Sequence, residues 1–97
     1  MSGVIVTFQD EDDFDRSLIE QVAAEAAPRF EGLPDLRSKA FTVDAANRRA
    51  INFYIWQSEQ GARLFFNDQM VERVTELYGV PPTIDFVEVA SLVDNAR

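Results

Sequence analysis

Three side chains with polar tips recur at two-residue intervals in the stretch 51–66, which reads INFYIWQSEQGARLFF. They are Asn52, Tyr54 and Trp56, and alternate residues of an extended strand share one face. An amide, a phenol and an indole N–H on one face can donate hydrogen bonds to a bound anion. Each also has a structural explanation: a satisfied core or interface aromatic for Tyr54 and Trp56, and a structural hydrogen bond for Asn52.

A positive charge and a base would complete such a site. Lys39 reaches the same face if the strand pairing places Phe41 opposite Asn52, but the sequence does not fix this register. A base would be Asp85, Lys39 or Tyr54 with a shifted pKa, or would be unnecessary for a ligand that is already ionised.

Three further apolar residues follow the strand, namely Phe65, Phe66 and Met70. They either pack in the core or wall a pocket between helix and sheet, where ligands commonly bind. We therefore include them, with Lys39, Phe41 and Asp85, among the expected substrate-binding residues.

Four strands are predicted to position these residues, over residues 4–9, 36–43, 51–56 and 83–90. The first and third carry large apolar residues on both faces, which is typical of strands covered on both sides. A polar turn at 44–47 joins the second and third strands as an antiparallel hairpin, with Asn47 expected in the left-handed conformation. Arg37 and Lys39 can also be explained as charges that protect a sheet edge.

Helices are predicted between the strands. An apolar stripe indicates a helix over 13–27, with Asp12 or Asp13 as N-cap and Pro28 ending it. Acidic residues cluster just before it, but the glycine that an EF-hand loop requires is missing, so no calcium site is expected. Ser58 is expected to cap the next helix, which breaks at 67–68, and a further helix over 68–78 ends at Gly79.

Composition limits the function further. The 97 residues are expected to form a single domain over 1–97 with no internal repeat. The net charge of −8 disfavours nucleic acid and anionic membranes, and no leader or membrane span is recognisable, so the cytoplasm is expected. The chain has no Cys and no His, so the commonest neutral metal and haem ligand is absent.

The order strand, helix, strand, strand, helix, strand is the βαββαβ plan of the α+β, ferredoxin-like fold. It predicts a four-stranded antiparallel sheet with the first and third strands at its centre and helices on one face. The opposite face would be bare in a monomer. We therefore expect a homodimer in which the two sheets pack face to face.

The chain also resembles a known group of proteins. The residues concerned are K-x-F at 39–41, N-x-Y-x-W-x-S at 52–58, a helix with Ala62, Phe65 and Phe66, and VERVTELYGVPPTI at 71–84. This pattern resembles the dimeric α/β-barrel proteins of the antibiotic-biosynthesis-monooxygenase-like group, particularly its branch of small monooxygenase-like chains.

The resemblance implies a ferredoxin-like dimer with one pocket in each subunit. Some members of the group oxidise phenolic, polycyclic or quinol-forming substrates with O₂ and no cofactor, using Asn, Trp and Tyr side chains. Others open haem and depend on a His that this chain lacks, and others have no known activity.

Two hypotheses for the function therefore remain open. One is a cofactor-independent monooxygenase, without metal, that acts on a small hydrophobic aromatic or quinol-type molecule, with Asn52, Tyr54 and Trp56 as catalytic residues. The alternative is a non-catalytic dimeric barrel that binds a small ligand or serves as an assembly module. An open cavity lined by these three residues would favour the enzyme, and solid packing would favour the alternative.

Overall fold

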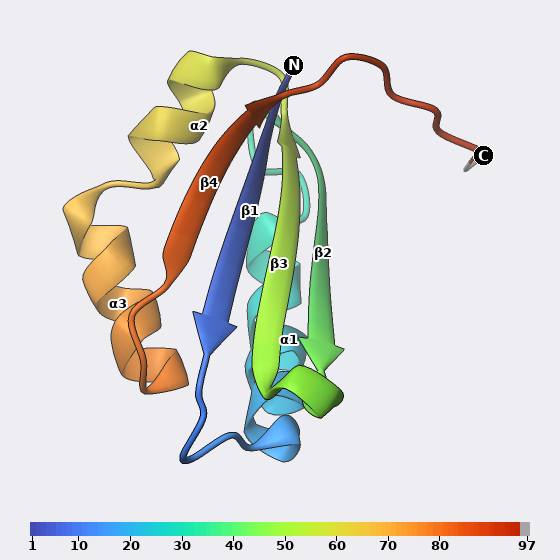
Figure 1. Cartoon of the computed structure of the whole chain (residues 1–97). Coiled ribbons are helices and arrows are strands. Elements are labelled where there is room, and N and C mark those ends of the chain that lie inside the picture. Colours follow the sequence, from blue (N-terminus) through green and yellow to red (C-terminus); the bar gives the residue numbers. More distant parts are fainter. Residues whose placement is uncertain (96–97) are drawn as a thin grey trace.

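The computed structural model describes residues 1–95 of the 97-residue chain. Its elements follow the βαββαβ order with the second helical part divided in two (Figure 1). In chain order they are β1 (Ser2–Gln9), α1 (Arg16–Phe30), β2 (Leu36–Asp44), a 3₁₀ turn η1 (Ala45–Asn47), β3 (Arg49–Trp56), α2 (Glu59–Phe65), α3 (Asp68–Tyr78) and β4 (Thr83–Glu88). Among the described residues, no helix is long and apolar enough to cross a membrane.

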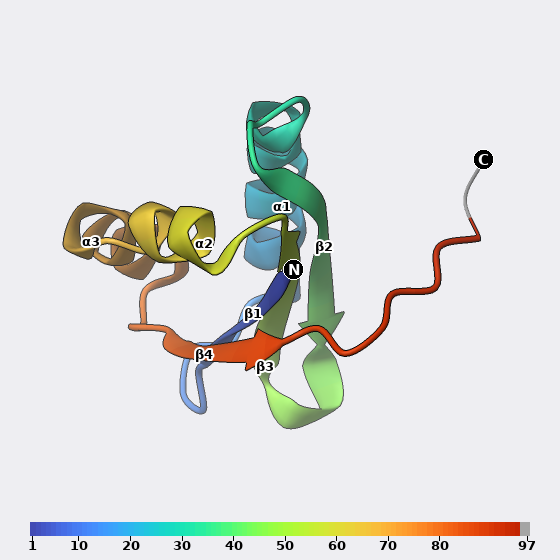
Figure 2. The same ribbon diagram turned by 90° about the horizontal axis from the view of Figure 1, so that it is seen from above.

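The four strands form one antiparallel sheet in the order β2-β3-β1-β4. The strands β1 and β3 are central, as their apolar character predicts. Figure 2, which looks along the strands, shows α1, α2 and α3 on the same side of the curved sheet. The predicted ferredoxin-like α+β fold is confirmed.

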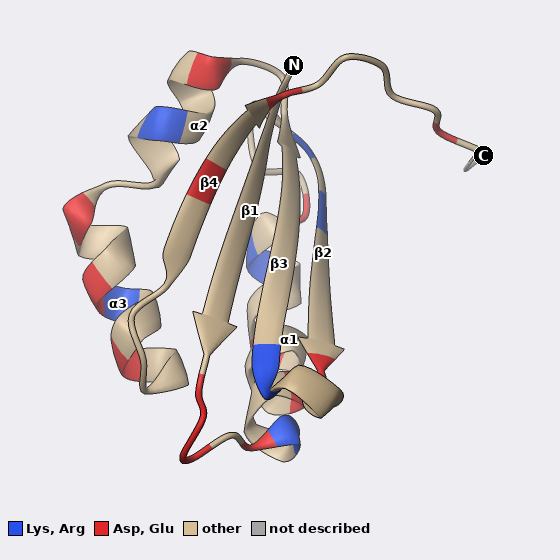
Figure 3. Cartoon of the chain, viewed as in Figure 1, with Lys and Arg blue, Asp and Glu red and all other residues tan. Residues whose placement is uncertain are grey.

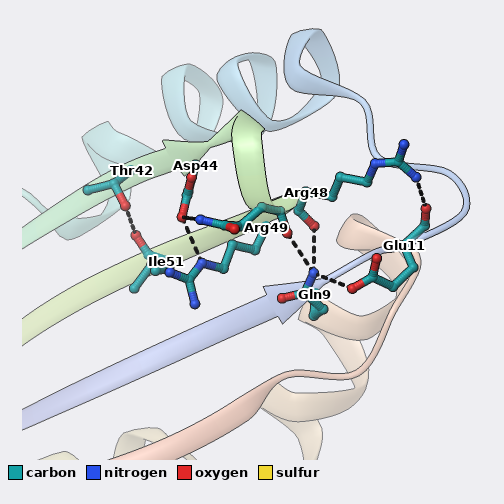
Figure 4. Close-up of polar contacts among 8 residues, drawn as sticks. Gln9, Glu11, Thr42, Asp44, Arg48, Arg49 and Ile51 are labelled. Carbon is teal, nitrogen blue, oxygen red and sulfur yellow. Dashed lines mark hydrogen bonds and ion pairs between the residues drawn. The ribbon is translucent and has the colours of Figure 1, made fainter.

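The hairpin between β2 and β3 fixes the register on which the candidate site depends. Phe41 pairs with Asn52 and Lys39 with Tyr54. Figure 4 shows the polar contacts at the turn, where the Asp44 carboxylate accepts hydrogen bonds from Asn47 and Arg49. These contacts hold the turn end of the hairpin in one register.

The prediction for the turn was wrong by one residue. Arg48, not Asn47, adopts the left-handed conformation, with φ of 53°. The Asn47 side chain is engaged with Asp44 as the last residue of η1, so the chain reverses at the next position.

Both ends of α1 differ from the prediction. Its N-cap is Asp15, whose carboxylate accepts a hydrogen bond from the Leu18 N–H, rather than Asp12 or Asp13. Pro28 lies inside the last turn, and the helix continues to Phe30. Phe30 packs against rings of the sheet and of α2, and this tertiary packing outweighs the loss of one backbone donor near the helix end.

The remaining helix ends agree with the prediction. Ser58 caps α2, and Asn67 caps α3 by accepting a hydrogen bond from the Met70 N–H. Gly79 ends α3 with φ of 81°, a conformation that costs glycine no steric strain. The last strand ends at Glu88 rather than at 90, because Glu88 pairs with Ser2, where the partner strand begins.

The two faces of the sheet differ in their environment. Beneath the helices, Val4, Val6, Phe8, Ala50, Tyr54 and Trp56 are almost fully buried. On the outer face, apolar side chains remain accessible, and Phe53 and Val87 are 45% and 46% exposed. Figure 3 shows the acidic and basic residues mainly on the helices, the loops and the strand ends, with one acidic residue, Asp85, midway along β4.

Candidate functional site

The helix-covered face of β3 carries Asn52, Tyr54 and Trp56. They are 4%, 3% and 2% exposed, because helices α1 to α3 cover this face. Neighbouring β2 adds Lys39 and Phe41 through the hairpin register. Two strands of fixed register therefore place amide, phenol, indole and amine groups beneath the helices.

A cavity of about 100 Å³ lies between the sheet, α1 and α3. Six of the nine predicted site residues line it: Lys39, Phe41, Asn52, Tyr54, Phe65 and Met70. Ligand pockets usually measure roughly 300–1,000 Å³, and an engineered cavity of about 150 Å³ can hold benzene. The cavity is therefore suited to one aromatic ring at most unless its walls move.

Lys39 is the charged side chain enclosed by aromatic rings. Its Nζ lies 3.4 Å from the ring centroid of Phe30, 4.0 Å from that of Phe41 and 4.4 Å from that of Tyr54. The ring faces replace part of the lost hydration of the ammonium group. The lining includes no Asp or Glu to compensate for the hydration that the rings do not replace. Burial therefore lowers the pKa of Lys39 to about 7. Near neutral pH this amine can therefore both accept and donate a proton.

Asn52 is held by a residue that the sequence did not single out for the site. Its side-chain N–H donates to the hydroxyl oxygen of Tyr78 over 3.3 Å, and the Tyr78 ring stacks on Phe8 with centroids 3.7 Å apart. Tyr78 also lines the cavity. The structural explanation of Asn52 thus holds in part, and its hydrogen bond brings a second phenol into the site.

The two tyrosines act as neutral groups. Burial raises the pKa of the Tyr54 hydroxyl well above its usual range, and the nearby Tyr78 contributes to this shift. Burial also raises the pKa of Tyr78, against the opposing effect of its hydrogen bond with Asn52. Both hydroxyls therefore stay protonated near neutral pH and can donate hydrogen bonds. Of the predicted bases, Tyr54 is thus unsuited to the task.

Trp56 lies next to the cavity without lining it. Its ring stacks on Tyr54 at 6.2 Å and meets Phe65 at 5.1 Å, so it supports two residues that do line the cavity. Its indole N–H is buried and has no hydrogen-bond partner among the described residues. An unpaired buried donor of this kind costs about 1–3 kcal/mol.

The last two predicted residues lie elsewhere. Phe66 packs edge-on against Tyr54 at 4.9 Å, behind the cavity wall. Asp85 is exposed on the outer face, where it pairs with Ile5. The structure therefore does not bring Asp85 together with the other candidates.

The helices add cavity residues that were not predicted from the sequence. Arg29 and Phe30 come from the last turn of α1, and Arg73 and Tyr78 from α3. The sequence could have indicated Arg73 as a cavity residue, because it follows the predicted Met70 by three residues and so shares its helix face. For Arg29 and Phe30 there was no such indication, because Pro28 predicted that the helix had already ended.

Another depression on the surface lies away from the candidate residues. A wider depression of about 550 Å³ near the start of β1 and the end of β4 has a mostly polar lining that includes Glu59 and Glu88. No predicted site residue lines it, so we assign it no role. Within residues 1–95, no group of three or more Asp or Glu side chains is placed to hold a metal ion.

Comparison with solved structures supports the same fold. A monooxygenase from the gene ActVA-Orf6 of Streptomyces coelicolor, in complex with the ligand nanaomycin D, has a TM-score of 0.70 at 20% identity, over 98% of this chain and 92% of its own. A mutant of SnoaB, a cofactor-independent oxygenase from Streptomyces nogalater, has a TM-score of 0.66 at 12% identity, over 95% of both chains. A dimeric ferredoxin-like protein of unknown function from Thermobifida fusca has a TM-score of 0.67 at 17% identity, over 91% of this chain and 90% of its own.

No protein-family model matches the chain. No curated protein matches its sequence either. The resemblance suggested by the sequence is thus confirmed as a likeness of fold to antibiotic biosynthesis monooxygenases.

Proposed function

We propose that this chain is a cofactor-independent monooxygenase that oxidises a phenol or quinol of one aromatic ring. The observation that carries the proposal is the Lys39 amine, which lines a cavity of about 100 Å³ and is surrounded by three aromatic faces. The likeness of fold to a cofactor-independent oxygenase supports the reaction type. The cavity volume supports the restriction to one ring.

In the proposed reaction, neutral Lys39 accepts the proton of the phenol. The resulting phenolate then lies beside a lysine cation in a site of low dielectric, where their attraction is stronger than in water. Tyr54 and Tyr78 line the same cavity and stay protonated, so they can donate hydrogen bonds to developing negative charge. Asn52 positions Tyr78 through their mutual hydrogen bond.

The substrate supplies every electron. Its anion passes one electron to O₂, and the phenoxyl radical and superoxide combine at a ring carbon that bears hydrogen to form a peroxide anion, which takes back the proton held by Lys39. Loss of water leaves a carbonyl at that carbon. Hydroquinone and O₂ would thus give hydroxyquinone and one water molecule, so one oxygen atom enters the product and the other leaves as water.

We further propose that the protein is a homodimer joined through the outer face of the sheet. The exposed apolar residues of this face support it, because monomeric proteins rarely expose large contiguous apolar patches. The fold is also shared with a ferredoxin-like protein described as dimeric.

The non-catalytic alternative retains one supporting observation. The cavity is small, and Trp56, one of the three expected catalytic residues, does not line it. On this alternative the cavity would hold a single-ring ligand without converting it.

Oxygen uptake and product formation distinguish the two functions. We expect metal-free protein to convert hydroquinone or methylhydroquinone faster than a blank without protein, and to leave anthrone, which has three fused rings, unconverted. An absence of turnover with every one-ring quinol would favour the alternative.

The pH profile of kcat/KM tests the role of Lys39. We expect the rate to rise through pH 7 as Lys39 loses its proton, because Tyr54 and Tyr78, whose pKa values burial raises, stay neutral there. Lys39→Arg can still pair with an anion but cannot accept a proton, so its profile should follow the ionisation of the quinol instead. An unchanged profile in Lys39→Arg would contradict the role.

A further inference from the structure

The charged residues that line the cavity all have the same sign. They are Arg29, Lys39 and Arg73, and no Asp or Glu lines the cavity. The whole chain has 17 acidic residues and only 9 basic ones. One third of its basic residues therefore surround one small cavity in a protein of net charge −8.

The side chains of the other described basic residues already have an ion-pair or hydrogen-bond partner within the protein. Arg16, Arg37, Arg49 and Arg63 form ion pairs with Glu20, Asp94, Asp44 and Glu59. Arg48 donates a hydrogen bond to the backbone oxygen of Glu11, as Figure 4 shows. Among the basic residues within 1–95, only Arg29, Lys39 and Arg73 have side chains that make neither an ion pair nor a hydrogen bond. Apart from Arg48, whose partner is an uncharged carbonyl, the basic side chains of this part of the chain that lack a carboxylate partner all line the cavity.

The three groups lie at different depths. Arg29 at the end of α1 and Arg73 in α3 are solvent-exposed, so they lie where the cavity meets solvent. Lys39 lies deeper, between the rings of Phe30, Phe41 and Tyr54. A ligand that satisfies this arrangement has an aromatic ring inside and an anionic group at the opening.

We propose that the ligand of this cavity is a one-ring aromatic carboxylic acid, whose ring packs between the aromatic side chains and whose carboxylate pairs with Arg29 and Arg73. The guanidinium group presents parallel N–H donors that match a carboxylate. The local cations also counter the repulsion that a protein of net negative charge exerts on an anion. This inference rests on the proposed function only in treating the ligand as the substrate, which would then be a phenolic acid.

Binding of matched probes under argon tests the inference without turnover. The probes are 4-hydroxybenzoate and the neutral 4-hydroxybenzyl alcohol, which share a ring and a phenol, titrated at low salt and followed by backbone amide NMR shifts. We expect the acid to bind about tenfold more tightly than the alcohol, the size of effect that charge-assisted pairing produces. Shifts should be largest at residues that line the cavity.

Matched variants separate local pairing from overall charge. Arg29→Gln and Arg73→Gln should each weaken binding of the acid by about three- to tenfold and leave binding of the alcohol unchanged. Arg16→Gln on α1 and Arg63→Gln on α2 remove the same charge away from the cavity, and should leave both affinities unchanged. Unchanged binding of the alcohol also establishes that a variant is folded.

Equal affinity for acid and alcohol, or equal weakening by Arg63→Gln and Arg73→Gln, would overturn the inference. So would a failure of the acid to bind while a neutral quinol is oxidised, and that result would leave the proposed function intact. Tight binding of the acid without oxygen uptake on any phenolic acid or quinol would support the ligand class and contradict the monooxygenase.

Discussion

At the scale of single residues, the central feature is an amine kept among aromatic rings without a counter-ion. Lys39 is the only lysine of the chain, and it is partly buried in a lining that contains no carboxylate. A lysine in such surroundings reduces stability while it is charged. Active sites often contain buried ionisable groups of this kind, which are needed for reactivity although they lower the stability of the folded protein.

This cost predicts a pH-dependent effect of Lys39→Met. The pKa of Lys39 is lowered from 10.5 to about 7, so between these values the unfolded chain holds the proton that the folded chain has released. Stability therefore rises with pH over this range, and the penalty is fully present below pH 7. Lys39→Met should raise the melting temperature at pH 6.5 by at least about 4 °C, the shift that 1 kcal/mol produces in a domain of this size.

The same comparison at pH 9.5 is the control. There the parent lysine is neutral when folded and largely protonated when unfolded, so most of the penalty is absent and the two melting temperatures should converge. A gain of equal size at both pH values would show that the effect is one of packing rather than charge.

The sequence could predict part of this site. The period of two in β3 placed Asn52, Tyr54 and Trp56 on one face, and the condition that Phe41 should oppose Asn52 is met. It could not show that Trp56 would stop short of the cavity, or that Tyr78 would bond to Asn52 from α3. The position of Trp56 and the hydrogen bond of Asn52 both depend on the distance between the helices and the sheet. Side-chain packing sets this distance, and the local sequence pattern does not.

At the scale of elements, the length of α1 determines which of its residues line the cavity. If it ended before Pro28, as the sequence predicted, Arg29 and Phe30 would belong to a loop. Continuation of the helix instead places Phe30 against Phe41 of β2 and Tyr54 of β3, and brings Arg29 into the lining of the cavity. Sequence rules for proline describe the isolated helix, whereas here ring contacts of Phe30 with Phe41, Tyr54 and Phe65 stabilise one further turn.

The start of α1 offers a direct test of its observed boundary. Asp15 accepts a hydrogen bond from the Leu18 N–H, while Asp12 lies three residues earlier in the preceding loop. Asp15→Ala should lower the free energy of unfolding by about 1 kcal/mol, the usual value of a helix N-cap. Urea denaturation measures it.

Asp12→Ala removes the same charge and serves as the matched control. It should change the free energy of unfolding by less than about 0.5 kcal/mol, as surface substitutions usually do. A larger loss in Asp12→Ala than in Asp15→Ala would place the cap where the sequence first suggested.

At the scale of the whole molecule, the sheet has one face covered by its own helices and one face that is not. The fold itself was predictable, because the order of elements and the apolar strands β1 and β3 leave few arrangements open. The outer face is where the proposal of a homodimer is tested. Phe53 lies in its middle, between Ile5 and Ala40 on the neighbouring strands.

Phe53→Glu should convert a dimer into a monomer, because it would bury a carboxylate between two apolar sheets. Light scattering coupled to size-exclusion chromatography at micromolar concentration measures the mass. Leu64→Glu provides the control, since Leu64 is 69% exposed on α2, on the helix side of the sheet. A parent protein that stays monomeric at high concentration would contradict the dimer.

The proposed role of Lys39 is tested most directly by titration of its own amine. Because the chain has a single lysine, protein labelled with ¹³C and ¹⁵N only in lysine gives one side-chain signal, and its shift can be followed from pH 5 to 11. We expect a pKa of about 7 for Lys39 in the free protein, rising when a one-ring phenolic acid is added and an anion comes to lie beside the ammonium group. A pKa near 10.5 that does not change with the phenolic acid would contradict the proposed role, since the amine could then be neither the base nor the partner of a bound anion.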